Sequence, residues 1–398
     1  MKTARFALVL FLLCRYISLA QVCNSPEVAG GAVPKRGLDI PVEIHGGGIF
    51  VPVIMNDGQT YKFLLDSGFE ESVLDPATVR TLHLSAGEKH AETAPGGQVE
   101  TTSVKGVHRL VGGVALINES LSSLDLSGFT PLFGQRLDGV LGYDFLQQFV
   151  VVLDYQQQRL TLCDPASFRA DRHPILLNLE TRQPYIDVQI DRKNGKPIHA
   201  SLEIDTGKQD PFSLSAAFAR RNGFMTDSST FLALKGVSVG GNTQAWLTRA
   251  KSLHFAGLSI KNPIMGIAEE NGDRAGQLGY GVLRRFRVTF DYSRKQAFFE
   301  RNTSFQEPYE FDHAGLIFGA GEPQLSTLTV LMVIAGTPAS KAGLREGDDV
   351  LTIDGRPANT FTLDEARAYF EHAVGARTLT IRRGGSTITV TFACRRLV

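Results

Sequence analysis

Two short stretches of the 398-residue chain place an aspartate where it could do acid–base chemistry. Residues 63–68 read Phe-Leu-Leu-Asp-Ser-Gly, and residues 202–207 read Leu-Glu-Ile-Asp-Thr-Gly. Two carboxylates held at hydrogen-bond distance share one proton, so that one acts as a base while the other acts as an acid. Such a pair can activate a water molecule and protonate a departing amide nitrogen.

The residues that follow the two aspartates support this chemistry. Ser67 and Thr206 carry small hydroxyl groups that could hydrogen-bond across the pair and hold the two loops. Gly68 and Gly207 allow the tight backbone turn that brings the loops together, and both are candidate peptide-binding residues. Taken singly, each tripeptide is an ordinary turn sequence, and only the matching context favours a site. The candidate catalytic residues are Asp66, Asp205, Ser67 and Thr206.

The context of the two stretches repeats along the chain. Asp205 follows Asp66 by 139 positions (205 − 66), and Gly279 follows Gly142 by 137 (279 − 142). An apolar-Asp-Tyr run at 153–155 also recurs 137 positions later. Three features in the same order indicate duplication of one unit, with a period longer than that of solenoid repeats.

Each unit is predicted to be built of strands with one short helix. Asp57-Gly58 is a hairpin turn between two extended runs. In the first unit, Asp75 is a good N-cap for a helix that ends near Leu82. In the second unit, a helix is expected to start at Ser213 or Ser215.

These features together resemble the retropepsin-like aspartic proteases, over about residues 40–302. The family pattern is two apolar residues before Asp-Ser/Thr-Gly, with a hydrophobic-Gly segment later in the lobe. The residues that match it are 64–68 and 140–142, then 204–207 and 277–279. The resemblance implies two acid-protease β-barrel lobes related by a pseudo-two-fold axis, with Asp66 and Asp205 as the dyad. By their place in each lobe, Gly97–Lys105 and 236–244 are expected to be mobile flap hairpins over the cleft.

Some residues depart from the family pattern. Phe69 and Lys208 stand where a small residue is usual, and Glu203 replaces an apolar residue. Glu70, Glu71 and Lys208 place charges near the dyad, and a nearby cation favours ionised carboxylates. The predicted function is an aspartic-type endopeptidase acting on peptides or proteins. The alternative is a catalytically inactive peptide-binding protein with a protease-like cleft.

The C-terminal part of the chain has a different pattern. It contains Gly-Leu-Ile-Phe at 315–318, a strand at 328–334, and a Thr362/Glu365 capping box that opens a helix. This stretch closely resembles a PDZ domain of the bacterial protease-associated type, an α+β module. The resemblance implies that loop N–H groups bind the C-terminal carboxylate of a peptide, which adds as a strand beside the loop. The candidate peptide-binding residues are Gly315, Leu316, Ile317 and Phe318.

Composition and the N-terminus indicate an exported protein, periplasmic or secreted. Lys plus Arg and Asp plus Glu balance at 41 each, and nothing suggests a nucleic-acid partner. A basic start followed by an apolar run is typical of a signal peptide. Membrane attachment is expected only if this signal stays uncleaved or Cys23 is lipidated. The expected organisation is a signal peptide at 1–20, a linker at 21–39, protease-like lobes at 40–165 and 166–303, and a PDZ domain at 304–398.

No cofactor or metal is expected, because the chain has no C-x-x-C motif and its nine His are scattered. After cleavage Cys23, Cys163 and Cys394 remain. Their odd number leaves at least one free thiol or an intermolecular pair.

Overall fold

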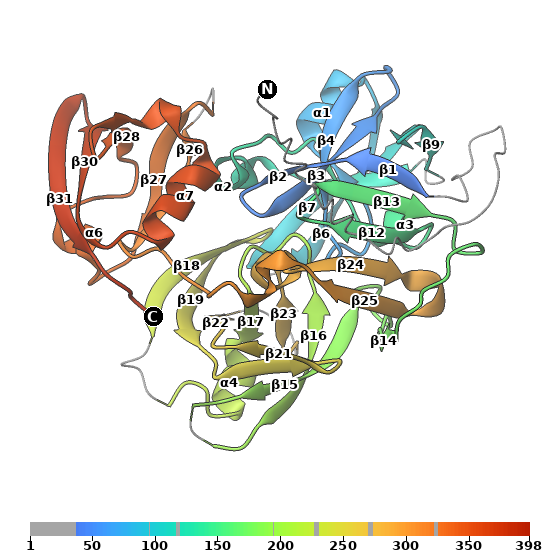
Figure 1. The fold of residues 1–398 in the computed structure, drawn as a ribbon. Coiled ribbons are helices and arrows are strands. Elements are labelled where there is room, and N and C mark those ends of the chain that lie inside the picture. The colour runs from blue at the N-terminus through green and yellow to red at the C-terminus, as the bar shows by residue number, and fades with distance from the viewer. Residues whose placement is uncertain are drawn as a thin grey trace, which may run out of the picture.

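A computed structural model describes residues 37–94, 96–116, 120–193, 195–226, 231–269, 274–321 and 325–398. The predicted signal peptide, Cys23 and nearly all of the expected linker lie outside these residues. The described chain forms four β-sheets with short helices around them (Figure 1). The predicted mainly-β fold is therefore confirmed.

The first repeated unit forms a ten-stranded sheet, called here the lobe-1 sheet. Its strands are β2 (Glu43–His45), β3 (Gly48–Ile54), β4 (Thr60–Leu65), β5 (Val73–Leu74), β6 (Ser85–Ala94), β7 (Gly97–Lys105), β8 (Leu110–Val111), β9 (Val114–Ala115), β10 (Ser120–Ser123) and β11 (Gly139–Leu141). They follow the order β6-β7-β10-β5-β11-β4-β3-β8-β9, with β2 beside β3. The antiparallel pair β3 and β4 encloses the predicted turn, where Gly58 has a left-handed φ of 76°.

The second unit forms the nine-stranded lobe-2 sheet. Its strands are β15 (Tyr185–Asp191), β16 (Ile198–Ile204), β17 (Phe212–Ser215), β18 (Leu232–Ser238), β19 (Gly241–Arg249), β20 (Ser252–Phe255), β21 (Leu258–Lys261), β22 (Ile264–Ala268) and β23 (Gly276–Leu278). Their order, β18-β19-β22-β17-β23-β16-β15-β20-β21, repeats that of the lobe-1 sheet step for step. The duplication predicted from spacing is thus also a duplication of topology.

A six-stranded shared sheet joins the two units. Its strands are β1 (Leu38–Pro41), β12 (Val150–Asp154), β13 (Arg159–Cys163), β14 (Ile175–Leu176), β24 (Phe286–Asp291) and β25 (Gln296–Arg301), in the order β1-β13-β12-β24-β25-β14. The equivalent strands β12 and β24 are antiparallel neighbours with Val152 opposite Thr289. Strand β1 begins at Leu38, two residues inside the expected linker, because it pairs with β13.

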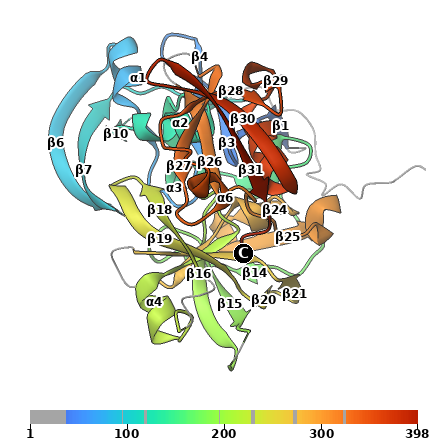
Figure 2. The same ribbon diagram turned by 90° about the vertical axis from the view of Figure 1, so that its left-hand side faces the viewer.

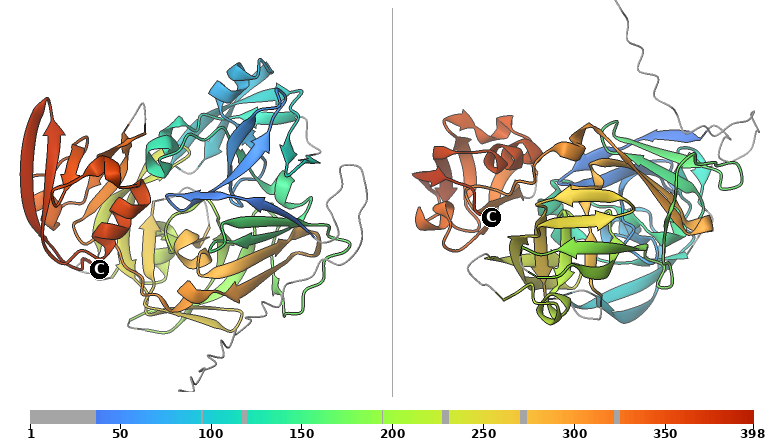
Figure 3. Two further views of the ribbon diagram at one scale, coloured as in Figure 1. Left: turned by 45° about the horizontal axis from the view of Figure 1, so that its top comes forward. Right: turned by 60° about the horizontal axis from the view of Figure 1, so that its bottom comes forward.

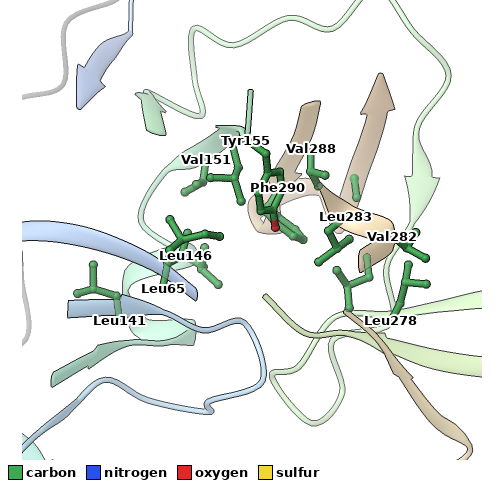
Figure 4. Packing of buried hydrophobic residues seen from close by; sticks show 14 of the residues in the cluster. Leu65, Leu141, Leu146, Val151, Tyr155, Leu278, Val282, Leu283, Val288 and Phe290 are labelled. Atoms are coloured by element: carbon green, nitrogen blue, oxygen red, sulfur yellow. The ribbon is translucent and has the colours of Figure 1, made fainter. Parts of the chain in front are cut away.

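One apolar core extends through both lobes and the shared sheet. Figure 4 shows Leu65 and Leu141 from lobe 1 and Leu278 from lobe 2, with Val151 and Phe290 of the shared sheet nearby. All five side chains are fully buried. Because close-packed interiors resist movement, this core holds the strand ends that carry the two aspartates rigidly in place.

Two of the short helices, α1 (Pro76–Thr81) and α4 (Ala216–Arg221), begin at capping residues that the sequence predicted. The others are α2 (Thr130–Phe133), α3 (Tyr143–Leu146) and α5 (Tyr280–Leu283), with 3-10 turns η1 (Ser127–Phe129), η3 (Tyr292–Arg294) and η4 (Thr303–Gln306). The Asp75 side chain accepts a hydrogen bond from the Ala77 N–H and caps α1. Of the two candidate caps for α4, Ser215 is the one that accepts from Phe218 N–H.

The C-terminal module has its own sheet and core. Its elements are β26 (Leu316–Gly321), β27 (Thr327–Val333), α6 (Pro338–Lys341), β28 (Asp349–Ile353), β29 (Arg356–Pro357), η5 (Ala358–Thr360), α7 (Leu363–Glu371), β30 (Gly375–Arg383) and β31 (Ser386–Cys394). The sheet order β26-β27-β28-β30-β31 makes β26 an edge strand. The predicted capping box between Thr362 and Glu365 opens α7, and Phe370 of this helix packs on Phe318 of β26.

The C-terminal module lies to one side of the two lobes (Figure 3). The segment that leads to it is held by lobe 2. Arg285 donates hydrogen bonds to the carbonyls of Ser304 and Pro308, and its guanidinium lies 3.6 Å from the Tyr309 ring centroid. Arg249 donates to the Tyr309 carbonyl at 2.7 Å. These contacts fix the starting point of the module against lobe 2.

Candidate active site

The ends of β4 and β16 bring Asp66 and Asp205 to equivalent places in the two lobes. Asp66 N–H donates to the Leu141 carbonyl at 3.0 Å, and Asp205 N–H donates to the Leu278 carbonyl at 2.9 Å. The hydrophobic-Gly segments therefore lie directly behind the aspartate loops. A Cβ atom at Gly142 would lie 2.8 Å from the Phe69 carbonyl, so this approach requires glycine.

The two carboxyl groups meet at the junction of the lobes. They are 8% and 9% exposed, and each lies against the loop of the other lobe. The N–H groups of Gly68 and Gly207 donate to Oδ1 of Asp66 and Asp205 at 2.8 and 2.9 Å. The structure thus brings the aspartate and the glycine of both tripeptides together at one junction.

The two glycines serve a different purpose from the one predicted. Neither is among the residues with left-handed φ, so the backbone turn does not require them. A Cβ atom at Gly207 would lie 2.1 Å from Asp66 Oδ2, and one at Gly68 would lie 3.2 Å from Asp205 Cγ. A side chain at position 207 would therefore clash with the Asp66 carboxyl group, and one at position 68 would crowd Glu203 and Asp205.

Ser67 and Thr206 form four hydrogen bonds that cross between the lobes. Ser67 Oγ donates to the Ile204 carbonyl at 2.6 Å and accepts from Thr206 N–H at 3.1 Å. Thr206 Oγ1 donates to the Leu65 carbonyl at 2.8 Å and accepts from Ser67 N–H at 3.0 Å. Both hydroxyl groups are buried. The prediction that they hold the loops together agrees with this arrangement.

The surroundings of the two carboxyl groups shift their pKa values to different extents. Burial and the charge of Asp205 raise the pKa of Asp66 well above its usual range. Burial also raises the pKa of Asp205, but the Lys208 cation and the loop N–H groups oppose that rise. Because the Lys208 cation acts on Asp205, it favours placing the shared proton on Asp66.

A third carboxylate, Glu203, lies beside the dyad in lobe 2. It is fully buried, and Arg274 Nη1 donates to its Oε2 at 2.9 Å. Its negative charge contributes to the raised pKa of Asp66. Gln277 Nε2 donates to Asp205 Oδ2 at 2.7 Å.

Sequence reasoning noted Glu203 but missed Gln277 and Arg274. The signal for Gln277 is the repeat itself, because Glu203 pairs with Gln277 across β16 and β23 while Leu64 pairs with Val140 across β4 and β11. A polar pair thus replaces an apolar pair at the equivalent position. Arg274 lies before β23, outside the paired strands, and no comparable signal marks it.

The two unusual residues after the glycines do not displace the loops. Phe69 packs against the apolar cluster around Phe50 and Leu64. The Lys208 ammonium lies 3.7 Å from Asp210 Oδ2. The carbonyls of Phe69 and Lys208 accept from Tyr143 and Tyr280 N–H groups at 3.0 and 2.8 Å.

Two long hairpins extend from the lobes, and their tips meet (Figure 2). A Cβ atom at Gly97 would lie 2.7 Å from the Gly240 carbonyl of the other tip. The first hairpin comprises β6 and β7, whereas the predicted flap contained β7 alone. Strand β6 was missed because its side chains are polar and nearly all exposed, without apolar alternation.

A cavity of about 820 Å³ lies under the first hairpin. It is lined by α1, by β6 and β7, by residues 123–129 and by the tip of the second hairpin. The two aspartates are not among its lining residues, so the cavity is a neighbouring space and not the dyad itself.

The predicted peptide loop of the C-terminal module is partly occupied by the chain itself. Asp312 Oδ1 accepts from the N–H groups of Ala314, Gly315 and Leu316 at 2.8, 2.6 and 2.9 Å. Burial raises the pKa of Asp312 to about 7, against these three hydrogen bonds. The expectation that Leu316 N–H is open to a peptide carboxylate is therefore wrong. Ile317 and Phe318 continue as the edge strand β26.

Cys163 and Cys394 are both buried, and Cys394 carries a free thiol. Within the described ranges, no cluster of His, Cys, Asp and Glu could hold a metal ion. None of the described helices is long and apolar enough to cross a membrane.

The comparisons with known families agree with this architecture. Residues 51–145 match the family model described as Aspartyl protease, and residues 300–393 match the model described as PDZ domain. No curated protein matches the chain. The chain therefore combines an aspartyl protease domain with a C-terminal PDZ domain, which is a peptide-binding module.

Proposed function

We propose that the protein is an aspartic-type endopeptidase whose catalytic dyad is Asp66 and Asp205. The observation that carries this proposal is the approach of the two buried carboxyl groups, one from each lobe, each of which lies against the glycine loop of the other. The aspartyl protease match in lobe 1 supports it, as does the repeated strand order that gives lobe 2 an equivalent loop.

In the proposed reaction, the ionised Asp205 removes a proton from a water molecule held between the carboxyl groups. The hydroxide attacks the peptide carbonyl carbon while Asp66 donates its proton to the carbonyl oxygen, which yields a tetrahedral diol. Asp205 then transfers its proton to the amide nitrogen, and Asp66 takes a proton back from a diol hydroxyl. The C–N bond breaks and leaves a carboxylic acid and an amine. Ser67 and Thr206 position the loops and transfer no proton.

The assignment of base and acid follows from the charges next to each group. The Lys208 cation favours the ionised form of Asp205. The Glu203 charge disfavours ionisation of Asp66. Environments that move the pKa values of two neighbouring carboxyl groups apart are typical of acid–base pairs.

The test is hydrolysis of an unfolded casein substrate by the full chain. Asp66→Asn and Asp205→Asn should each abolish cleavage with unchanged folding, and the double variant should be no worse, because the two groups act as one unit. Asp187→Asn, at an exposed position of β15, is the matched control and should stay active. A hydroxyl-bearing transition-state analogue should inhibit. Full activity in either Asn variant would refute the dyad, and inactivity of the wild-type protein would favour the peptide-binding alternative.

We further propose that the PDZ domain recruits protein substrates by binding an extended peptide along β26. The support is the place of β26 at the end of the sheet order and its position beside α7. Export to the periplasm or the extracellular space remains a proposal from the N-terminal sequence.

A further inference from the structure

The groove between β26 and α7 is already occupied by lobe 1. Helix α2 lies against β26 (Figure 1). A Cβ atom at Gly134, directly after α2, would lie 3.2 Å from Leu363 Cδ2 and 3.6 Å from Ala320 Cβ. Leu363 belongs to α7 and Ala320 belongs to β26. The segment 130–134, called here the plug, therefore touches both walls of the groove.

Arg367 of α7 connects the plug to the edge strand. Its guanidinium donates to the Phe318 carbonyl at 2.7 Å and to the Leu132 carbonyl of α2 at 2.7 Å. The Phe318 carbonyl lies on the open edge of β26, where an added strand would use it. In this arrangement the carbonyl is paired with Arg367 instead.

A second loop of lobe 1 supports the plug. Gly46 N–H donates to both carboxylate oxygens of Asp364 in α7, at 3.0 and 3.2 Å. A Cβ atom at Gly46 would lie 2.9 Å from the Leu132 carbonyl. The glycine-rich turn between β2 and β3 is thus shaped to fit against α7 and the plug together.

The plug covers the groove from Phe318 to Ala320. The contacts described above do not extend to Gly315. A peptide that adds to β26 beyond Phe318 must therefore take the place of the plug. Strand addition gains its affinity from main-chain hydrogen bonds along the edge, so a blocked edge carbonyl directly weakens it.

The plug also continues into the protease domain. Residues 127–129 form the turn η1 immediately before α2 and line the cavity under the first hairpin. On the opposite side, Lys235 of β18 pairs with Glu346 of the PDZ domain at 3.5 Å. The docked PDZ domain thus contacts a cavity-lining segment of lobe 1 and the hairpin of lobe 2.

We propose that the β26–α7 groove is a regulatory site, closed in the resting protein by its own plug, and that an extended peptide from a protein partner displaces the plug, moves the cavity-lining segment 127–129 with it and thereby accelerates cleavage. The effect on cleavage rests on the proposed peptidase function, whereas the competition for the groove does not. A tethered segment competes at the high effective concentration set by its linkage, so weak contacts suffice to hold it. If a peptide in the groove changes the affinity of the active site for its ligand by some factor, thermodynamic linkage requires that ligand to change the affinity of the groove for the peptide by the same factor.

A disulfide can lock the plug in place. A Cβ atom at Gly134 would lie 3.7 Å from Leu363 Cβ, which is within the range that a disulfide spans. The variant Gly134→Cys/Leu363→Cys is compared in its oxidised and reduced forms. Gly134→Ala/Leu363→Ala is the matched control, since it introduces the same left-handed strain at φ 65° without a thiol pair. Failure of the pair to cross-link would contradict the contact itself.

Binding is measured first, in an Asp66→Asn background so that no peptide is cut. A phage library displaying random C-terminal heptapeptides is panned on both forms. Recovery on the reduced form should exceed recovery on the oxidised form at least about tenfold, because the locked plug cannot leave. Equal recovery on the two forms, or no recovery on either, would overturn the proposal.

Cleavage is measured second, with Asp66 restored. An enriched heptapeptide, synthesised and added in trans, should accelerate casein hydrolysis by the reduced form and by the alanine control but not by the oxidised form. Acceleration of the oxidised form would overturn the coupling. Absence of hydrolysis in every form would instead contradict the peptidase function. The binding result would then decide by itself whether the plug and a peptide compete for the groove.

Discussion

Thr206→Val tests whether the hydroxyl groups join the two lobes. The substitution replaces Oγ1 with a methyl group of similar size and removes two of the four cross-lobe hydrogen bonds. It leaves Ser67 N–H and the Leu65 carbonyl without these partners in a site where Ser67 is 1% and Leu65 0% exposed. An unpaired buried polar group costs about 1–3 kcal/mol, so the expected loss is roughly 2–5 kcal/mol.

Urea unfolding measures this loss through the emission of Trp246, the single tryptophan, which lies in β19 of lobe 2. With an m-value of about 3 kcal/mol/M, the unfolding midpoint should fall by roughly 1 M. Thr60→Val, at the exposed start of β4, is the matched control and should leave the midpoint unchanged.

Ser67→Ala removes the other two bonds and should cost a similar amount. The double variant should lose less than the sum, since both hydroxyl groups belong to one network. Each single variant should keep more peptidase activity than Asp66→Asn does. A midpoint for Thr206→Val equal to that of the wild-type protein would refute the reasoning.

Three further predictions concern charge and pH. Lys208→Met removes the cation that lowers the pKa of Asp205, so the acid limb of the pH–rate profile should move to higher pH. Glu203→Gln removes a charge that raises the pKa of Asp66, so the alkaline limb should move to lower pH. The raised pKa of Asp312, about 7, means that the folded PDZ domain binds a proton which the unfolded chain releases near pH 4. Stability from this group is therefore greatest at low pH and is lost as pH rises through 7, by about 2–3 kcal/mol between pH 5 and 8.

The controls for these predictions differ. Lys208→Arg keeps the cation and should keep the acid limb in place, and movement of both limbs together in either charge variant would contradict the division of roles within the dyad. For the PDZ domain, Asp312→Asn should abolish the pH dependence of the melting temperature in this range. Wild-type stability that instead rises from pH 5 to 8 would show that the three N–H groups outweigh burial.

Short sequence motifs were sufficient to predict much of the architecture of this protein. The two Asp-Ser/Thr-Gly sequences and the Thr362/Glu365 capping box each depend on residues close in sequence, and the spacing from each aspartate to the hydrophobic-Gly segment is nearly equal in the two units. Through the family resemblances that they carry, these motifs predicted two lobes, a dyad and a PDZ domain, while strand alternation, capping and turn chemistry predicted the local elements because they act over a few residues.

Tertiary structure alone decided how these parts meet. The aspartates lie 139 positions apart and face each other only because β12 and β24 pair in the shared sheet. Asp312 fills the predicted carboxylate loop, and the plug enters the PDZ groove through Arg367, which reaches a carbonyl 235 positions away. Side-chain contacts with backbone groups at such separations leave no periodic signal, since any residue provides the same carbonyl. The sequence by itself therefore determined which groups could do the chemistry, and packing between lobes and domain decided what each group touches.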